Sequence, residues 1–159
     1  MTTTLLAEKL KSCNIFTALT DWELEQLAST ARIMHVDKGA LLITENTESR
    51  EVFMVLQGRV EVAITVPGVQ QKETIAIMQR GELFGELVLL GRNRRSASAT
   101  SKEECELICW NRDDLLKLFK ANHHVGYQVM TQIARVLADR LYSTNMGLRT
   151  ALAQSQAPV

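Results

Sequence analysis

The middle of the chain is a series of short segments in which apolar and polar residues alternate, and this pattern constrains the fold more than any other feature. It extends from residue 33 to residue 110. An alternation of period two is typical of strands with one buried face, and many short strands indicate a β-sandwich or a barrel. Turn-forming residues separate the segments at 37–39, 45–47, 57–59 and 67–68, and Gly58 is expected to form a hairpin turn. The apolar positions are Ile33, Leu41, Ile43, Val52, Phe53, Val55, Val60, Val62, Ile64, Val66, Ile75, Ile77, Leu107 and Cys109.

Helices are predicted before this β region, within residues 1–32. The first covers residues 5–13, where leucines recur at helical spacing. The second begins after Thr20 and ends near residue 31. Thr20 and Glu23 have the spacing of a capping box, in which each side chain accepts a hydrogen bond from the other residue's backbone N–H. Trp22 falls in the apolar set of this helix, so we expect it to pack into the core.

Two more helices are predicted after the β region, within residues 111–150. Asn111 and Asn122 stand where N-caps are expected, because each precedes a helical pattern. The second of these helices is long and ends near Arg149. Residues 151–159 are expected to form a frayed or disordered tail.

The last helix carries residues that repeat at intervals of seven. Two such series, offset by four residues, form an a/d seam of the kind that joins helices in a coiled coil. We therefore expect a parallel homodimer through this helix. The alternative is one apolar stripe packed on the barrel, which explains the upstream half of the helix well. The two series are Met130, Leu137 and Thr144, and Ala134, Leu141 and Leu148.

The segment 81–99 lies between two predicted strands and combines glycines, a carboxylate and basic residues. Gly85 lets the backbone approach a ligand closely because it has no Cβ, and residues 86–90 are long enough for one short helical turn with free N–H groups. Arg95 offers a planar fork of donors that fits phosphate oxygens. Glu86 only accepts hydrogen bonds when ionised, so it suits a sugar hydroxyl. These features predict a site for a small anion that carries a hydroxyl.

Two sequence blocks of this segment resemble the phosphate-binding cassette of the cyclic nucleotide-binding domain family, of the type found in bacterial catabolite activators and in regulatory subunits of cyclic-AMP-dependent kinase. The blocks are Phe84-Gly85-Glu86-Leu87 and Arg95-Ser96-Ala97, and a weaker likeness extends from about Ile15 to about Leu141. The resemblance implies a mainly β fold, a double-stranded β-helix (jelly roll) with N-terminal helices, a long C-terminal helix and the cassette inserted between two strands. Asn46 stands where the family often has glycine, and we expect its turn to be kept because asparagine tolerates a left-handed backbone.

The resemblance further implies a 3′,5′-cyclic nucleotide as the ligand. Glu86 would accept a hydrogen bond from the ribose 2′-hydroxyl, Arg95 would bind the cyclic phosphate, and Ser96 favours cyclic AMP over cyclic GMP. On the long helix, Leu141 departs from the polar pattern that contacts adenine, so Arg140 is expected to stack on the base. The expected ligand contacts are Phe84, Gly85, Glu86, Leu87, Arg95, Ser96, Ala97, Arg140 and Thr144.

Composition argues against several other classes of function. The 18 basic and 18 acidic residues balance, which argues against binding to nucleic acid or to a membrane surface. No group of residues has metal-ligand spacing and no nucleophile stands beside a base, so neither a metal site nor a catalytic site is expected. The cysteines Cys13, Cys105 and Cys109 are odd in number and no signal peptide is visible, which indicates free thiols in the cytoplasm.

These observations predict a cyclic nucleotide sensor that signals through its long C-terminal helix to an unidentified protein. If 159 residues is its natural length, we expect a stand-alone module, because no helix-turn-helix follows the long helix. Two alternatives stay open. The chain is the ligand-binding part of a transcription regulator whose DNA-binding domain lies outside this sequence, or it is an interaction scaffold that binds no nucleotide. An enzyme is the least favoured class.

Overall fold

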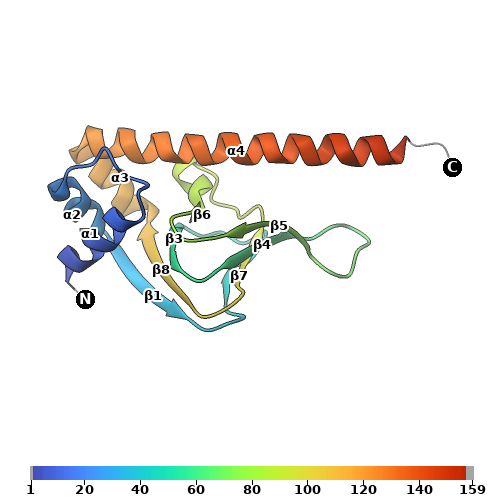
Figure 1. Cartoon of the computed structure of the whole chain (residues 1–159), viewed down its shortest axis with the longest axis horizontal. Coiled ribbons are helices and arrows are strands. Elements are labelled where there is room, and N and C mark those ends of the chain that lie inside the picture. Colours follow the sequence, from blue (N-terminus) through green and yellow to red (C-terminus); the bar gives the residue numbers. More distant parts are fainter. Residues whose placement is uncertain (1, 157–159) are drawn as a thin grey trace.

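Two antiparallel sheets face each other in the computed structural model, which describes residues 2–156. Each sheet has four strands, in the orders β1-β8-β3-β6 and β2-β7-β4-β5. This arrangement confirms the predicted jelly roll (Figure 1). The strands are β1 (Ala31–Val36), β2 (Leu41–Ile43), β3 (Glu51–Gln57), β4 (Val60–Ile64), β5 (Glu73–Met78), β6 (Leu83–Phe84), β7 (Ser98–Ser101) and β8 (Cys105–Asn111).

Strand β3 is buried on both of its faces. Alternate residues, Val52 and Met54 among them, pack against the helices, whereas Phe53 and Val55 point into the barrel. The ring of Phe53 stacks on that of Phe84 in the neighbouring strand β6, with centroids 5.1 Å apart. Because β6 lies near the start of the cassette segment 81–99, this packing fixes the position of the first cassette residues.

Gly58 does not form a hairpin turn, so this part of the prediction was wrong. The residue has φ of +87° and lies between β3 and β4, but these strands belong to different sheets. The turn therefore carries the chain from one sheet to the other. Asn46 has φ of +64°, which confirms the predicted left-handed turn.

The helices gather at one end of the barrel, and the last of them extends along one side of it (Figure 1). The capping box of Thr20 and Glu23 is present, and the Asn111 and Asn122 side chains cap the helices that follow them, as predicted. Trp22 is 64% exposed, so its predicted place in the core was wrong. The helices are α1 (Thr3–Ser12), α2 (Asp21–Ser29), α3 (Arg112–Ala121) and α4 (His123–Ser155), with a short 3₁₀ helix η1 (Glu86–Leu90).

Helix α4 has 33 residues, a length of about 50 Å. Its upstream part is buried through Val125, Val129 and Ile133, whereas every residue from 141 to 156 is exposed. The prediction of a disordered tail was wrong for 151–155, because the helix continues to Ser155. No glycine or proline interrupts 151–155, and alanine, leucine and glutamine are good helix formers. Residues 157–159 lie outside the described residues.

Helices α3 and α4 approach closely at Gly126, and a substitution tests this contact. A Cβ there would lie 2.9 Å from Cβ of Phe119 on α3. We expect Gly126→Ala to lower the free energy of unfolding by about 1–3 kcal/mol, because the helices must move apart. Gly147→Ala is the matched control on the same helix, since its Cβ would meet nothing within 4 Å. That control should raise stability by up to about 1 kcal/mol. Urea unfolding of both variants checks the contact, which is disproved if both are stabilised.

Candidate functional site

The cassette, residues 81–99, includes β6 near its start and contains the predicted short helical turn. Gly85 precedes η1 and Gly91 follows it, with φ of +74° and +83°. A Cβ on Gly85 would lie 2.8 Å from Nη1 of Arg95 and 3.0 Å from the carbonyl oxygen of Glu51. Glycine is therefore required here both by the left-handed backbone and by the close approach of the arginine.

The side chain of Arg95 points inward and is only 5% exposed. Its Nη1 donates to the carbonyl oxygen of Gly85 at 2.9 Å, and its Nη2 donates to Ser49 Oγ at 2.7 Å and to the carbonyl oxygen of Glu51 at 2.6 Å. Burial lowers the pKa of Arg95, while the carboxylates of Glu51 and Glu86 act in the opposite direction. An arginine remains charged despite such a shift. The donor Nε is buried and has no partner.

The backbone on either side of Arg95 is tied to the turn at Asn46. The Asn46 N–H donates to the carbonyl oxygen of Arg95 at 2.9 Å, and the Arg95 N–H donates to that of Thr47 at 2.9 Å. The left-handed residue of this turn thus helps to hold the arginine in place. The sequence predicts the left-handed turn at Asn46, but it does not predict that this turn is hydrogen-bonded to Arg95.

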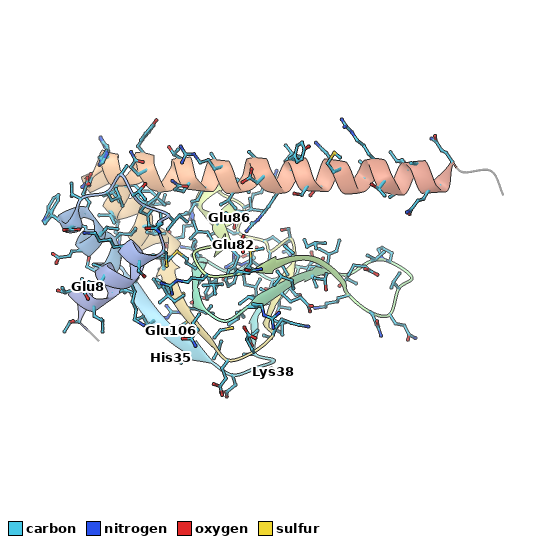
Figure 2. All side chains as sticks on the ribbon, viewed as in Figure 1. Glu8, His35, Lys38, Glu82, Glu86 and Glu106 are labelled. Atoms are coloured by element: carbon cyan, nitrogen blue, oxygen red, sulfur yellow. The ribbon has the colours of Figure 1, made fainter. Side chains whose placement is uncertain are left out.

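Glu86 is the most buried carboxylate of the site, with 2% of its surface exposed. Its Oε1 accepts a hydrogen bond from Nη1 of Arg140 at 2.6 Å, whereas its Oε2 is buried without a partner. Figure 2 shows Glu86 between α4 and the barrel. The ion pair joins residues 54 positions apart in the chain, and sequence reasoning missed it.

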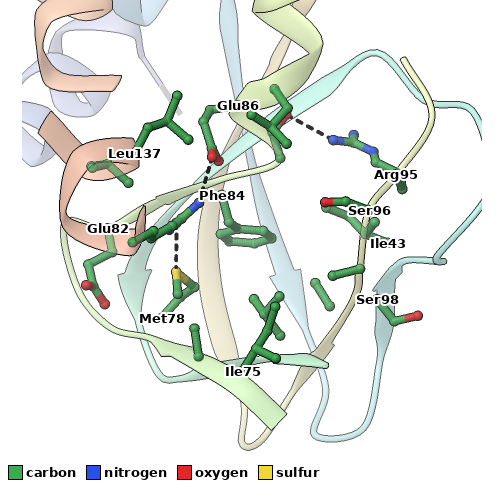
Figure 3. A pocket seen from close by; sticks show the side chains of 18 of the residues that line it. Ile43, Ile75, Met78, Glu82, Phe84, Glu86, Arg95, Ser96, Ser98 and Leu137 are labelled. Atoms are coloured by element: carbon green, nitrogen blue, oxygen red, sulfur yellow. Dashed lines mark hydrogen bonds and ion pairs between the residues drawn. The ribbon is translucent and has the colours of Figure 1, made fainter. Parts of the chain in front are cut away.

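A cavity of about 710 Å³ opens beside these side chains, between the barrel and α4. Figure 3 shows Glu86 and Arg95 on one side of it, Ile75 on the other and Leu137 on the helix. The volume is typical of small-molecule sites. The structure brings all the predicted contact residues to its lining, although their roles toward a ligand stay predictions. They are Phe84, Gly85, Glu86, Leu87, Arg95, Ser96, Ala97, Arg140 and Thr144.

Sequence reasoning missed the apolar wall of the cavity. These residues come from strands β2, β4 and β5 and from α4, and nothing in their local sequence separates them from ordinary core residues. Ser49, which fixes Arg95, was also missed, because its turn has no chemical signature of its own. The main apolar residues of the wall are Ile43, Val62, Ile75, Met78 and Leu137.

The rest of the described chain offers no other obvious chemical centre. Within residues 2–156, no group of three or more His, Cys, Asp or Glu side chains could hold a metal ion. Burial raises the pKa of the Cys109 thiol to about 12, so this cysteine is a poor nucleophile. In the same part of the chain, no helix is long and apolar enough to cross a membrane.

A jelly roll with a buried arginine and a buried glutamate beside one cavity defines a ligand-binding domain. Residues 33–122 match the family model described as "Cyclic nucleotide-binding domain", and the chain belongs to this family.

Two sequence relatives and one solved structure support this family assignment. The chain is 29% identical over 130 residues to the "Cyclic AMP receptor protein" of Thermus thermophilus, covering 82% of this chain and 60% of that protein. It is 30% identical over 94 residues to human "cGMP-dependent protein kinase 2", covering 59% of this chain and 12% of the kinase. The chain thus spans only part of the length of either relative, about three fifths of the receptor protein and about an eighth of the kinase. A solved cyclic nucleotide-binding domain from Methylobacillus flagellatus has the same fold, with a TM-score of 0.82 at 21% identity, over 92% of this chain and 85% of that one.

Proposed function

We propose that this chain binds a 3′,5′-cyclic nucleotide, with cyclic AMP preferred to cyclic GMP, and that it is a sensor without catalytic activity. One observation carries the proposal. Arg95 and Glu86 both line the cavity, and each has a buried side-chain atom without a partner, the donor Nε of Arg95 and the acceptor Oε2 of Glu86. Buried polar atoms without partners are costly, and a ligand that supplies both an anion and a hydroxyl would satisfy both.

The phosphate of the ligand would lie against Arg95. Hydrogen bonds from Nη1 and Nη2 to the protein hold the guanidinium in place, and Nε and the second N–H of Nη1 are left for phosphate oxygens. The backbone N–H groups of Ser96 and Ala97 would donate to the same phosphate. The small side chains of these residues leave room for it.

The sugar and the base would lie toward α4. Glu86 would accept from the ribose 2′-hydroxyl, with Gly85 and Leu87 in contact through their backbone and Phe84 beneath them. The base would lie between the apolar wall and the helix, near Thr144. The preference for cyclic AMP rests on the family resemblance, because serine follows Arg95 directly at position 96.

The exposed half of α4 supports a homodimer that carries the signal. Leu141, Leu148 and Leu152 are 63%, 56% and 51% exposed, and they lie on one side of the helix. Met130 and Leu137, upstream in the seam, pack partly against the chain's own core. We propose that the downstream half of α4 pairs with the same helix of a second copy. We also propose that ligand binding shifts α4, and that an unidentified cytoplasmic partner binds the surface that this shift changes.

A second candidate is the ligand-binding part of a transcription regulator. The similarity to the Thermus cyclic AMP receptor protein favours nucleotide binding, in either form, over a scaffold that binds no nucleotide. The binding chemistry is the same in both cases, and a longer reading frame that contains a DNA-binding domain would distinguish them.

Titration calorimetry with cyclic AMP, cyclic GMP and 2′-deoxy cyclic AMP tests the binding proposal. We expect cyclic AMP to bind more tightly than cyclic GMP. The 2′-deoxy analogue should bind about 10- to 100-fold more weakly than cyclic AMP, because it cannot donate to the buried carboxylate of Glu86. An absence of binding by all three ligands at millimolar concentration would disprove the function. Equal affinity for the deoxy analogue would disprove the role of Glu86.

A further inference from the structure

Three arginines of one loop line the cavity, and only one of them is buried. Arg95 is 5% exposed, whereas Arg92 and Arg94 are exposed, and we call these two the rim arginines. The chain as a whole has 18 basic and 18 acidic residues, so a positive field at this point comes from local arrangement and not from net charge. No acidic residue interrupts the run Arg92-Asn93-Arg94-Arg95.

The rim arginines are only weakly engaged by the rest of the chain. Arg94 donates from Nη1 to the carbonyl oxygen of Asn46. Its Nη2 lies 3.8 Å from Oε1 of Glu48, but the two side chains are 65% and 73% exposed, and such a surface pair contributes little. Within residues 2–156, no ion pair involves Arg92. The positive charge of both side chains is therefore available to a ligand that approaches from solvent.

The acidic residues of the lining lie elsewhere around the cavity. Glu86 is paired with Arg140 at 2.6 Å, so these two charges offset each other. The other lining carboxylates are those of Glu82, in the turn between β5 and β6, and Asp139, on α4. Figure 3 shows Glu82 beside the helix and Arg95 on the opposite side of the cavity. The cavity is thus positive at residues 92–95 and negative toward α4.

This distribution of charge acts on an anion before the anion reaches the site. A cleft with apolar walls concentrates the field of the charges at its opening, which raises the association rate of a ligand of opposite charge. The field extends about 30 Å at 0.01 M ionic strength but only about 8 Å at 0.15 M. Exposed charges change mainly the association rate, whereas buried, hydrogen-bonded charges change mainly the dissociation rate. The rim arginines have the first kind of position and Arg95 has the second.

We propose that the rim arginines steer the cyclic phosphate to Arg95 and orient the nucleotide as it enters. This rests on the proposed function. Because the positive end of the cavity lies at residues 92–95, the nucleotide enters with its phosphate toward Arg95 and its base toward α4. The rate of capture then depends on ionic strength, whereas the rate of release depends on the buried contacts of Arg95.

Stopped-flow fluorescence tests the steering, with a cyclic AMP that carries a fluorophore at C8 of the base and so keeps its phosphate and ribose hydroxyl free. We expect Arg92→Gln/Arg94→Gln to lower the association rate constant about 5- to 20-fold at about 0.01 M ionic strength. The dissociation rate constant should stay within about twofold of that of the unmodified chain. At about 0.5 M salt, the difference in association rate should fall below about twofold, because the field is screened.

Arg135→Gln/Arg149→Gln is the matched control, since it makes the same change in net charge at two exposed arginines of α4 that do not line the cavity. Its association rate constant should stay within about twofold of the unmodified value. Equal association rates for the unmodified chain and the rim variant, or an equal loss in both double variants, would overturn the proposal. A faster dissociation without slower association would also overturn it, because the rim arginines would then be contacts of the bound ligand. If neither the labelled nor the unlabelled cyclic AMP binds the unmodified chain, the proposed function itself has failed.

Discussion

Replacement of Arg95 by glutamine is expected to weaken cyclic AMP binding by about 10- to 100-fold. A hydrogen bond to a charged group contributes about 1.5–3 kcal/mol, and in the proposed function Arg95 supplies the buried cation for the phosphate. Three protein acceptors hold the guanidinium in place, and glutamine carries no charge to replace it. Calorimetric titration measures the change in affinity. The same replacement leaves the carbonyl oxygens of Gly85 and Glu51 without this donor, so a loss of stability is also expected.

An arginine away from the cavity provides the control for this experiment. Arg149 on α4 is exposed and is not among the residues that line the cavity. Its replacement by glutamine removes an equal charge and should change the affinity by less than about threefold, because exposed charges are screened by water and salt. Thermal unfolding of both variants without ligand separates lost stability from lost binding. If Arg95→Gln remains folded and binds cyclic AMP as the unmodified chain does, the phosphate is bound elsewhere.

Much of the fold and part of the site follow from local sequence patterns. The period of two predicts the strands, and the caps at Thr20, Asn111 and Asn122 fix where helices begin, because these signals act over a few residues. The main residues of the cassette are likewise close together in the sequence. Gly85 and Glu86 are adjacent and Arg95 follows within one loop, so an anion site could be predicted from their spacing together with the family resemblance.

The contacts that sequence reasoning missed join distant parts of the chain. Arg140 pairs with Glu86 across 54 positions and Arg95 with Ser49 across 46, and no periodicity encodes such a partner. The hairpin assigned to Gly58 failed for a similar reason. A glycine turn is compatible with two strands of one sheet or of different sheets, and only the packing of the whole barrel decides between them.

The apolar stripe on α4 is a local sequence pattern that also bears on whether the chain forms a dimer. Within the described chain the stripe is covered only in its upstream part, where Val125, Val129 and Ile133 meet the core. The downstream leucines remain exposed on a helix that extends along and beyond the cassette (Figure 1). A row of exposed leucines is a liability for a monomer, and a second copy would bury it.

Introduction of glutamate at both Leu141 and Leu148 is therefore expected to convert a dimer into a monomer. Each leucine buried in a dimer interface contributes about 1.5–3 kcal/mol, and burial of unpaired carboxylates would add a further cost. Sedimentation equilibrium at micromolar concentration measures the change in mass. The matched control adds glutamates at Thr150 and Ala153, which are exposed on the other side of the same helix at about 3.6 residues per turn. That variant should remain dimeric. The proposed interface is wrong if the unmodified chain is a monomer. It is also wrong if the two double variants have the same mass, because Leu141 and Leu148 would then contribute no more to dimerisation than the other side of the helix.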